Sequence, residues 1–395
     1  MRAMTDIVIA IFWFLIILLL HSYFGYFIII YLLSRMRRDT KDVALDFKPL
    51  RVALVIAAYN EEDVIKEKIE NCLALAYPRE ALSIWVASDG SADKTNQIVK
   101  EFSAKSDQVR LVALPRKGKA NALNAVFKHV SSDIVVFSDA NSDFSPEAVK
   151  EMVKHFADSK IGCVCGRLVY KNPSGVISGK GESFYWRYET QLKILESRLG
   201  YVAGANGSIY AIRRELFESL PARTINDDFL ISMRIVQKGF KCIYEQNAVA
   251  FEHVSPTMEG EFLRHVRDGA GHYMVVGHLA GLLNPFLGIK AFIFWSHRIL
   301  RWMAPFILIL LLLINISLVS INFYRHILFL QILFYALAVG GLLSVKQKKI
   351  PFVIYAPFYF CNLNLALLIG FLKVILGKQK VMWDRTERSQ VRAKS

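Results

Sequence analysis

Cysteine is scarce in this sequence, and its placement excludes two classes of protein. The five cysteines among 395 residues show no metal-ligand spacing, and an odd number argues against a disulfide framework. Cys163 and Cys165 lie in an apolar run that predicts a strand, so we expect buried thiols there. Internal repeats and low-complexity segments are also absent, which leaves no sign of a repeat protein or a disordered chain.

Charged residues are absent from four long apolar stretches in a chain that is 54% hydrophobic. A helix of about 20 residues crosses the hydrocarbon layer of a membrane, so each stretch predicts a membrane helix. The first stretch is too long for a secretory signal and no small-residue cleavage site follows it, which favours a retained anchor. The four stretches are Ile7–Leu33, Met303–Ser320, Ile327–Ser344 and Pro351–Leu372.

Acidic residues are in the minority, with 34 Asp and Glu against 49 Lys and Arg and a net charge of +15. Nucleic-acid binding is one explanation, but the basic residues gather beside the apolar stretches, where attraction to anionic lipid headgroups is simpler. Arg35, Arg37 and Arg38 directly follow the first stretch and place the next domain in the cytosol. We therefore expect a multi-pass protein of the plasma or inner membrane, with membrane lipids and no nucleic acid as partners.

The side on which the C-terminus lies stays open. With a cytosolic domain, three crossings after residue 300 would leave the C-terminus outside, whereas Lys378, Lys380 and Arg385 favour the inside. The prolines and asparagines between Pro351 and Leu376 would suit a re-entrant or interfacial segment.

Between residues 50 and 285 the sequence has the texture of a soluble α/β domain. Short β-branched runs alternate with helical patterns, which predicts a parallel sheet with crossover helices. Ser145 and Pro146 predict the N-cap and first residue of a further helix. The predicted strands are Val52–Ala57, Leu82–Ala87, Val109–Leu114 and Ile134–Phe137, and the predicted helices Glu61–Leu75, Asp93–Phe102 and Lys119–Val130.

The chain thus divides into five expected parts. They are an N-terminal transmembrane anchor at 1–34, a cytosolic catalytic domain at 50–285, an interfacial helix at 286–302, a C-terminal transmembrane region at 303–376 and a basic tail at 377–395.

Polar residues follow three of the predicted strands. Asn, Asp, Gly and Ser are ordinary turn residues, but ligands bind at the carboxyl ends of parallel strands. Three such segments at one edge of a sheet therefore favour a site. They are Tyr59-Asn60-Glu61-Glu62, Ser88-Asp89-Gly90-Ser91 and Ser138-Asp139-Ala140-Asn141.

Three features within the domain suit particular chemistry. Asp139 follows a run apolar enough for a central strand, where a carboxylate near a diphosphate would hold Mg²⁺ or Mn²⁺. Lys117 and Lys119 flank a helix start, which suits a phosphate or is simply a solvated basic turn. Asp227 and Asp228 open another helix, where two acids complement the helix dipole or provide a general base.

These motifs, in this order, resemble the membrane members of glycosyltransferase family 2, the group of the cellulose, hyaluronan and poly-N-acetylglucosamine synthases. The resemblance covers residues 50 to about 270 and the flanking helices. It implies a GT-A fold, which is an α/β, Rossmann-like and mostly parallel sheet. It also implies inverting sugar transfer from a nucleotide sugar. The motifs are Val55–Glu61, Ser88–Ser91, Lys119–Asn124, Asp139–Asn141, Gly204–Gly207, and Asp227-Asp228 followed by Arg234 and Gly239.

The resemblance assigns roles to individual residues. Asp228 matches the catalytic base that activates the acceptor. The nucleotide sugar would be held by Tyr59, Glu61, Asp89, Lys119 and Asp139. The divalent metal would be held by Asp139, Asn141 and His253, although a lone histidine is more often structural. The acceptor side would include Gly204, Asn206, Asp227 and Arg267.

Two departures from the family pattern matter. Asn141 stands where the family often has Asp, which lowers the negative charge offered to a metal. Only Arg267 remains of the Gln-x-x-Arg-Trp motif of processive members, because Asp268 replaces the tryptophan. This puts processive polymerisation in question.

The leading hypothesis is therefore transfer of a sugar, from a UDP-sugar in particular, to a growing polysaccharide or a lipid-linked glycan. A membrane-associated nucleotidyltransferase is one alternative, since its sheet and metal site resemble these. A non-catalytic transport or binding protein with a degenerate domain is the other. Against the latter stand Asp139 and Asp228 and the scarcity of ionisable residues in the apolar stretches.

Overall fold

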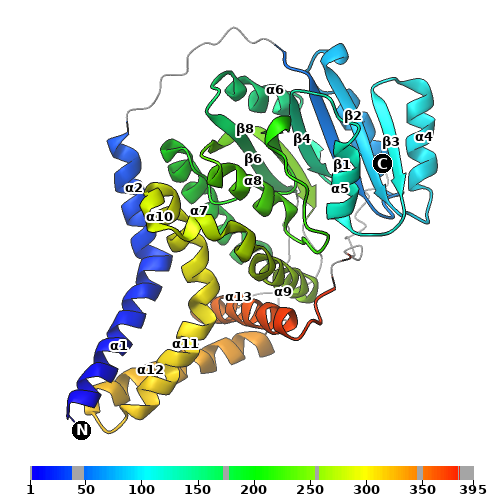
Figure 1. The fold of residues 1–395 in the computed structure, drawn as a ribbon. Coiled ribbons are helices and arrows are strands. Elements are labelled where there is room, and N and C mark those ends of the chain that lie inside the picture. The colour runs from blue at the N-terminus through cyan, green and yellow to red at the C-terminus, as the bar shows by residue number, and fades with distance from the viewer. Residues whose placement is uncertain are drawn as a thin grey trace.

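The computed structural model describes residues 2–37, 49–171, 178–253, 258–344, 350–380 and 382. An eight-stranded sheet lies beside a group of long helices, as Figure 1 shows. The strand order is β3-β2-β1-β4-β7-β6-β8-β5. The first four strands in chain order are β1 (Val52–Ala58), β2 (Leu82–Asp89), β3 (Val109–Leu114) and β4 (Ile134–Asp139). Wherever these four strands pair with one another, they run parallel.

The second half of the sheet is mixed. Strand β7 (Tyr210–Arg213) pairs antiparallel with both β4 and β6 (Ile161–Lys171), whereas β6 runs parallel to β8 (Lys241–His253). The short β5 (Asp143–Phe144) pairs antiparallel with β8. The predicted strands are confirmed, but this half was not predicted in detail because its pairings join segments distant in sequence.

Helices cover both faces of the sheet, so the central strands are buried on both sides. Every residue of β1 is buried, and one large apolar cluster lies on each face. Cys163 and Cys165 are buried free thiols in β6, as predicted. The helices of this part are α3 (Ile65–Leu73), α4 (Thr95–Lys105), α5 (Lys119–Phe127), α6 (Ala148–Val153), α7 (Ser178–Leu199), α8 (Asp227–Gln237) and α9 (Met258–Val275).

The predicted start of α6 was wrong by two residues. The N-cap is Glu147, and α6 begins at Ala148. Ser145 instead donates its backbone N–H to Val249 of β8, and its carbonyl accepts from Ala148. Pairing with β8 therefore holds Ser145 outside the helix.

Four helices in the described residues are long and apolar enough to cross a membrane. The first joins α1 (Arg2–Leu20), a π-helical turn (His21–Gly25) and α2 (Tyr26–Met36). The second joins α10 (Ile289–Ile293), a π-helical turn η7 (Phe294–Ile299) and α11 (Leu300–Ser317). The others are α12 (Asn322–Leu343) and α13 (Phe352–Ile375). The helix from Ile289 to Ser317 is continuous, so the residues expected to form an interfacial helix run into α11 without a break.

The long apolar helices are tied to each other and to the part of the chain that contains the sheet. The start of α1 packs against α11 and α12, where Trp13 donates a hydrogen bond to the Tyr324 hydroxyl. Helix α13 packs against both α12 and α9, and Figure 1 shows α9 and α13 side by side. Short connections of 3₁₀ helix, Val276–Leu283 and Pro285–Leu287, join α9 to α10.

Candidate active site

The carboxyl ends of β1, β2 and β4 meet at one edge of the sheet, as parallel pairing requires. Asn60, just beyond β1, has a positive φ of 52°, a conformation that asparagine tolerates better than most residues. Its backbone N–H and side-chain oxygen bond to Ser91 and Ala92 of the loop after β2. Two of the predicted polar loops are therefore joined directly.

Asp89 is buried at the end of β2 and organises the loop before α5. Its carboxylate accepts hydrogen bonds from the backbone N–H groups of Lys117 and Gly118. The same carboxylate forms an ion pair with Arg116, in which Oδ2 lies 2.9 Å from Nη1. The Arg116 guanidinium lies 3.1 Å from the centre of the Tyr59 ring. Tyr59 and Asp89 thus share one cationic neighbour. Arg116 was not predicted, although it directly precedes the basic turn that was.

Lys119, the first residue of α5, links the two acidic segments of the site. Its Nζ lies 3.0 Å from Asp139 Oδ1 and 3.3 Å from Asp227 Oδ1. Burial opposes the charge on this lysine, but the carboxylates of Asp139, Asp227 and Asp228 outweigh it and raise the pKa of Lys119. The structure therefore brings together residues that are 20 to 109 positions apart in the sequence.

The carboxylates of Asp139 and Asp228 meet at Gly207. A Cβ placed on Gly207 would lie 3.4 Å from Asp228 Oδ2 and 3.6 Å from Asp139 Oδ2. Both acids therefore face the same small volume. Glycine leaves that volume open, which a larger residue would fill.

Asp228 has an unusually high affinity for protons. Burial, together with the charge of the adjacent Asp227, raises the pKa of Asp228 to about 7. Burial also raises the pKa of Asp227, although Lys119 opposes this. A carboxyl group whose pKa lies near neutrality is suited to accept a proton in catalysis.

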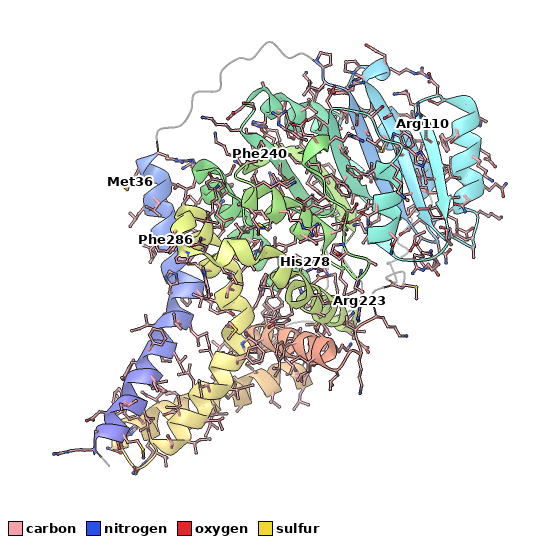
Figure 2. The ribbon with its side chains drawn as sticks, viewed as in Figure 1. Met36, Arg110, Arg223, Phe240, His278 and Phe286 are labelled. Carbon is pink, nitrogen blue, oxygen red and sulfur yellow. The ribbon has the colours of Figure 1, made fainter. Side chains whose placement is uncertain are left out.

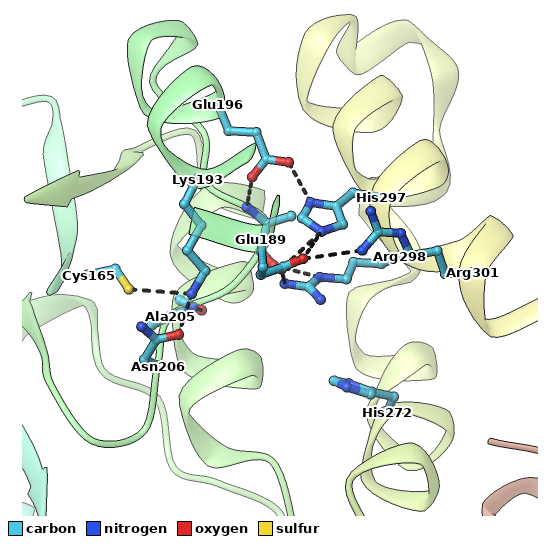
Figure 3. Close-up of polar contacts among 12 residues, drawn as sticks. Cys165, Glu189, Lys193, Glu196, Ala205, Asn206, His272, His297, Arg298 and Arg301 are labelled. Carbon is cyan, nitrogen blue, oxygen red and sulfur yellow. Dashed lines mark hydrogen bonds and ion pairs between the residues drawn. The ribbon is translucent and has the colours of Figure 1, made fainter. Parts of the chain in front are cut away.

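The loop from Gly204 to Gly207 is fixed against α8. Gly204 has a φ of 106°, and a Cβ there would lie 2.6 Å from the Phe229 ring. The backbone N–H of Ala205 donates to Ser232 Oγ, which in turn donates to the Asp228 carbonyl. Asn206 accepts a hydrogen bond from the buried Lys193 (Figure 3). Its side-chain nitrogen donates to the Gly166 carbonyl. Lys193 was not predicted, and nothing in its local sequence marks it.

A second unpredicted group supports the segment that follows Asp139. The buried Lys68 donates to the Ser142 carbonyl and lies 4.1 Å from the centre of the Phe144 ring. The Ser142 hydroxyl donates to Glu252 of β8. These contacts hold the loop that carries Asn141, which is half-buried two residues after Asp139.

The remaining predicted site residues are placed as follows. Glu61 is buried, and its backbone N–H donates to the Thr95 hydroxyl at the start of α4. Arg267 is half-buried on α9. This helix is linked to the site, because the Asp268 carbonyl accepts a hydrogen bond from the side chain of Asn226, which is the N-cap of α8. The His253 backbone ends β8, but its side chain lies outside the described residues, so the prediction of a metal ligand there stands untested.

A surface hollow of about 410 Å³ lies at the other edge of the sheet, at the amino ends of β1 and β2. Arg51, Gln108 and Arg110 are among its lining residues, and Figure 2 shows Arg110 far from the membrane helices. None of the predicted site residues lines this hollow. The convergent carboxylates and cations at the carboxyl edge mark the stronger candidate site.

Residues 53–220 match the family model described as glycosyl transferase family 2. The chain carries a family 2 glycosyltransferase domain. The family predicted from the motifs is therefore confirmed. The matched residues hold every predicted nucleotide-side residue, whereas Asp227 and Asp228 lie just beyond them.

Two bacterial proteins are among the relatives that are similar in sequence. The poly-beta-1,6-N-acetyl-D-glucosamine synthase of Staphylococcus aureus (strain MSSA476) is 26% identical over 229 residues, which are 57% of this chain and 55% of that protein. The chain thus spans about half the length of that relative. The probable glycosyltransferase YdaM of Bacillus subtilis (strain 168) is 25% identical over 368 residues, 86% of this chain and 87% of that protein.

One solved structure resembles nearly the whole chain. It is the mannosyltransferase PcManGT from Pyrobaculum calidifontis in complex with GDP-Man and Mn²⁺, with a TM-score of 0.66 and 21% identity. The match covers 93% of this chain and 99% of that one. Together with the family 2 domain, this likeness confirms the predicted fold, a GT-A domain with flanking apolar helices.

Proposed function

We propose that this protein is a membrane glycosyltransferase that moves a sugar from a nucleotide-sugar donor to a glycan or lipid-linked acceptor. The observation that carries the proposal is the meeting of Asp139 and Asp228 at Gly207, with Lys119 bridging Asp139 and Asp227. Asp139 beside the Lys119 ammonium suits the binding of a charged donor. Asp228, with a pKa of about 7, suits the removal of a proton from an acceptor hydroxyl.

The donor end of the site would lie along Tyr59, Asp89 and Lys119. Asp89 fixes the loop before α5, where Arg116 and Lys119 place two cations at a helix start, and such a position suits a diphosphate. Glu61 would support the nucleotide from the loop after β1. We infer a UDP-sugar as the donor from the resemblance to the polysaccharide synthases of the family, and the similar Staphylococcus aureus protein is named for an N-acetylglucosamine polymer.

The acids at the carboxyl edge fit a divalent cation. Asp139 and Asn141 offer hard oxygen ligands, and Mg²⁺ and Mn²⁺ bind through one or two carboxylates together with substrate phosphates. His253 would be a further ligand. When bound, such a cation stabilises negative charge on the departing nucleoside diphosphate. In the described residues, no three His, Cys, Asp or Glu side chains form a metal cluster, so the substrate phosphates would complete the coordination.

Asp228 would activate the acceptor. As the acceptor oxygen bonds to the anomeric carbon of the sugar, the bond from that carbon to the diphosphate breaks and Asp228 takes the hydroxyl proton. This single displacement inverts the anomeric configuration. Gly204, Asn206 and Asp227 would line the acceptor side, with Arg267 contributing from α9.

The membrane would lie around the apolar helices, with the catalytic domain in the cytosol. The basic residues after the first helix support this orientation. Many large apolar side chains of the first membrane helix and of α12 are exposed, including Phe24, Phe329 and Leu330 at more than 60%, as expected for lipid contact. The expected divisions of the chain, from anchor to basic tail, are part of this proposal.

The proposal is tested by supplying radiolabelled UDP-N-acetylglucosamine, UDP-glucose and GDP-mannose to membranes that contain the full chain. Incorporation from one donor, lost with EDTA and restored with Mn²⁺, is the expected result. Label in the lipid extract would identify a lipid-linked acceptor, and label in insoluble material would identify a polymer. No incorporation from any donor, or release of pyrophosphate from a nucleoside triphosphate, would contradict the proposal.

A further inference from the structure

The membrane helix that begins at Ile289 reaches into the catalytic domain through one buried cluster. Its π-helical turn, Phe294–Ile299, carries His297 and Arg298, and Arg301 follows one turn later. Single π-helical turns within α-helices are frequent at functional sites. Figure 3 shows these three side chains pointing toward Glu189 and Glu196 of α7.

Glu189 binds three polar side chains of the membrane helix. It lies within 3.3 Å of His297, Arg298 and Arg301. Burial alone would raise the pKa of Glu189, but these three neighbours hold it well below its usual value. The carboxylate is therefore charged, and it fixes Arg298 in one position.

Arg298 also binds the loop of the proposed acceptor side. Its Nε donates to the Ala203 carbonyl at 2.7 Å, and its guanidinium lies 5.6 Å from the centre of the Phe229 ring. A Cβ on Gly204 would lie 3.6 Å from Arg298 Nη2. Phe229 directly follows Asp228 at the start of α8. Arg298 therefore lies against both the loop that leads to Gly207 and the start of α8, which carries Asp228.

The same peptide segment is held from its other side. The Ala203 N–H donates to Glu196 Oε2 at 2.9 Å, and Glu196 also contacts His297 and the Tyr26 hydroxyl. Tyr26 belongs to the first membrane helix. Both polar groups of Ala203 thus bond to a cluster that includes side chains from two membrane helices.

We propose that Arg298 is a positioning residue that sets the loop from Ala203 to Gly207 against Asp228, so that the membrane helices determine acceptor geometry. The proposal rests on the proposed function. It predicts a specific defect: acceptor attack is impaired while donor binding is kept, because Tyr59, Asp89 and Lys119 lie on other elements. Loss of alignment of about 1 Å can slow a reaction on the order of 10²-fold.

The test uses the Arg298→Lys variant of the full chain in detergent. Lysine keeps the charge but lacks the planar fork that reaches Ala203 and Glu189 together. The probe is whichever of the three labelled nucleotide sugars the wild type turns over. We expect a fall in kcat on the order of 10²-fold with unchanged donor Kd and a raised ratio of donor hydrolysis to transfer.

The matched control is Arg325→Lys. Arg325 is exposed on α12 and donates to the Val319 carbonyl, far along the chain from the site, and its replacement should leave kcat unchanged. If Arg298→Lys does not fold, Tyr26→Phe removes one contact of Glu196 and should lower kcat by about fivefold, the effect of one hydrogen bond.

The outcomes separate the two proposals. A wild type that transfers no sugar contradicts the proposed function itself. An active wild type whose Arg298→Lys variant keeps its kcat overturns the positioning role. So does a variant whose donor binding and unfolding temperature fall together with kcat, since that pattern indicates a general structural role.

Discussion

Asp228 provides the clearest link between environment and chemistry at the scale of single residues. Because burial and Asp227 raise its pKa to about 7, the acid is ionised, and able to accept a proton, only above that pH. We expect kcat/KM to rise tenfold per pH unit below about 7 and to level off above it, since kcat/KM reports groups of the free enzyme. A flat profile between pH 5 and 8 would contradict this assignment.

Lys119 tunes the same titration. Its positive charge lowers the pKa of Asp228, opposing the effect of burial. The Lys119→Met variant should therefore shift the midpoint of the kcat/KM profile to higher pH, whatever its effect on the maximal rate. A midpoint that stays in place would show that the two groups do not interact in solution.

Several site residues could be predicted from the sequence, and others could not. Asp89, Asp139 and Asp228 were found because each lies at a strand end or helix start within a recognisable motif. Lys193 and Lys68 were missed because their roles depend on burial beside segments that are distant in sequence. No local pattern distinguishes these lysines from exposed ones.

At the scale of helices and strands, the parallel half of the sheet follows from local sequence. Apolar β-branched runs predicted β1 to β4 to within two residues. The mixed half did not follow, because β7 pairs with strands on both sides through contacts that only the folded chain creates. The start of α6 was wrong for a related reason, since pairing with β8 overrides the local capping preference of Ser145.

The contact between α9 and α13 depends on Gly370. A Cβ there would lie 2.7 Å from the Ala270 nitrogen and 2.8 Å from the Val266 carbonyl oxygen, both backbone atoms of α9. We expect Gly370→Ala to destabilise the protein by about 1–3 kcal/mol, as overpacking does. Thermal unfolding in detergent measures the effect.

Gly340 provides the matched control. It lies within α12, and a Cβ there would meet nothing within 4 Å. Gly340→Ala should leave the unfolding midpoint unchanged or raise it, because alanine favours helix. Equal midpoints for the two variants would show that α9 and α13 do not pack closely.

At the scale of the whole molecule, the path of α13 bears on the topology. Near its start, Phe358 contacts Gly341 at the end of α12, and near its end Gly370 contacts α9 of the catalytic domain. Helix α13 therefore packs against a helix of the domain as well as against α12. We expect α13 to be interfacial or re-entrant, which places the basic C-terminal tail in the cytosol.

Labelling with a membrane-impermeant maleimide tests this topology. A cysteine replacing Ser320, exposed between α11 and α12, should react from outside the cell, and one replacing Lys378 should react only after permeabilisation. The unaltered chain provides the blank, because four of its cysteines are buried and Cys361 is half-buried. Labelling of Lys378→Cys in intact cells would show that α13 crosses the membrane.

The transfer assay with Asp228→Asn tests the central claim most directly. Asparagine keeps the shape of Asp228 but cannot accept the proton, so transfer should fall to background while the labelled donor still binds. Asp133→Asn, an exposed acid paired with Arg51 at the opposite edge of the sheet, should transfer at the wild-type rate. Transfer by Asp228→Asn at a rate near that of the wild type would contradict the account.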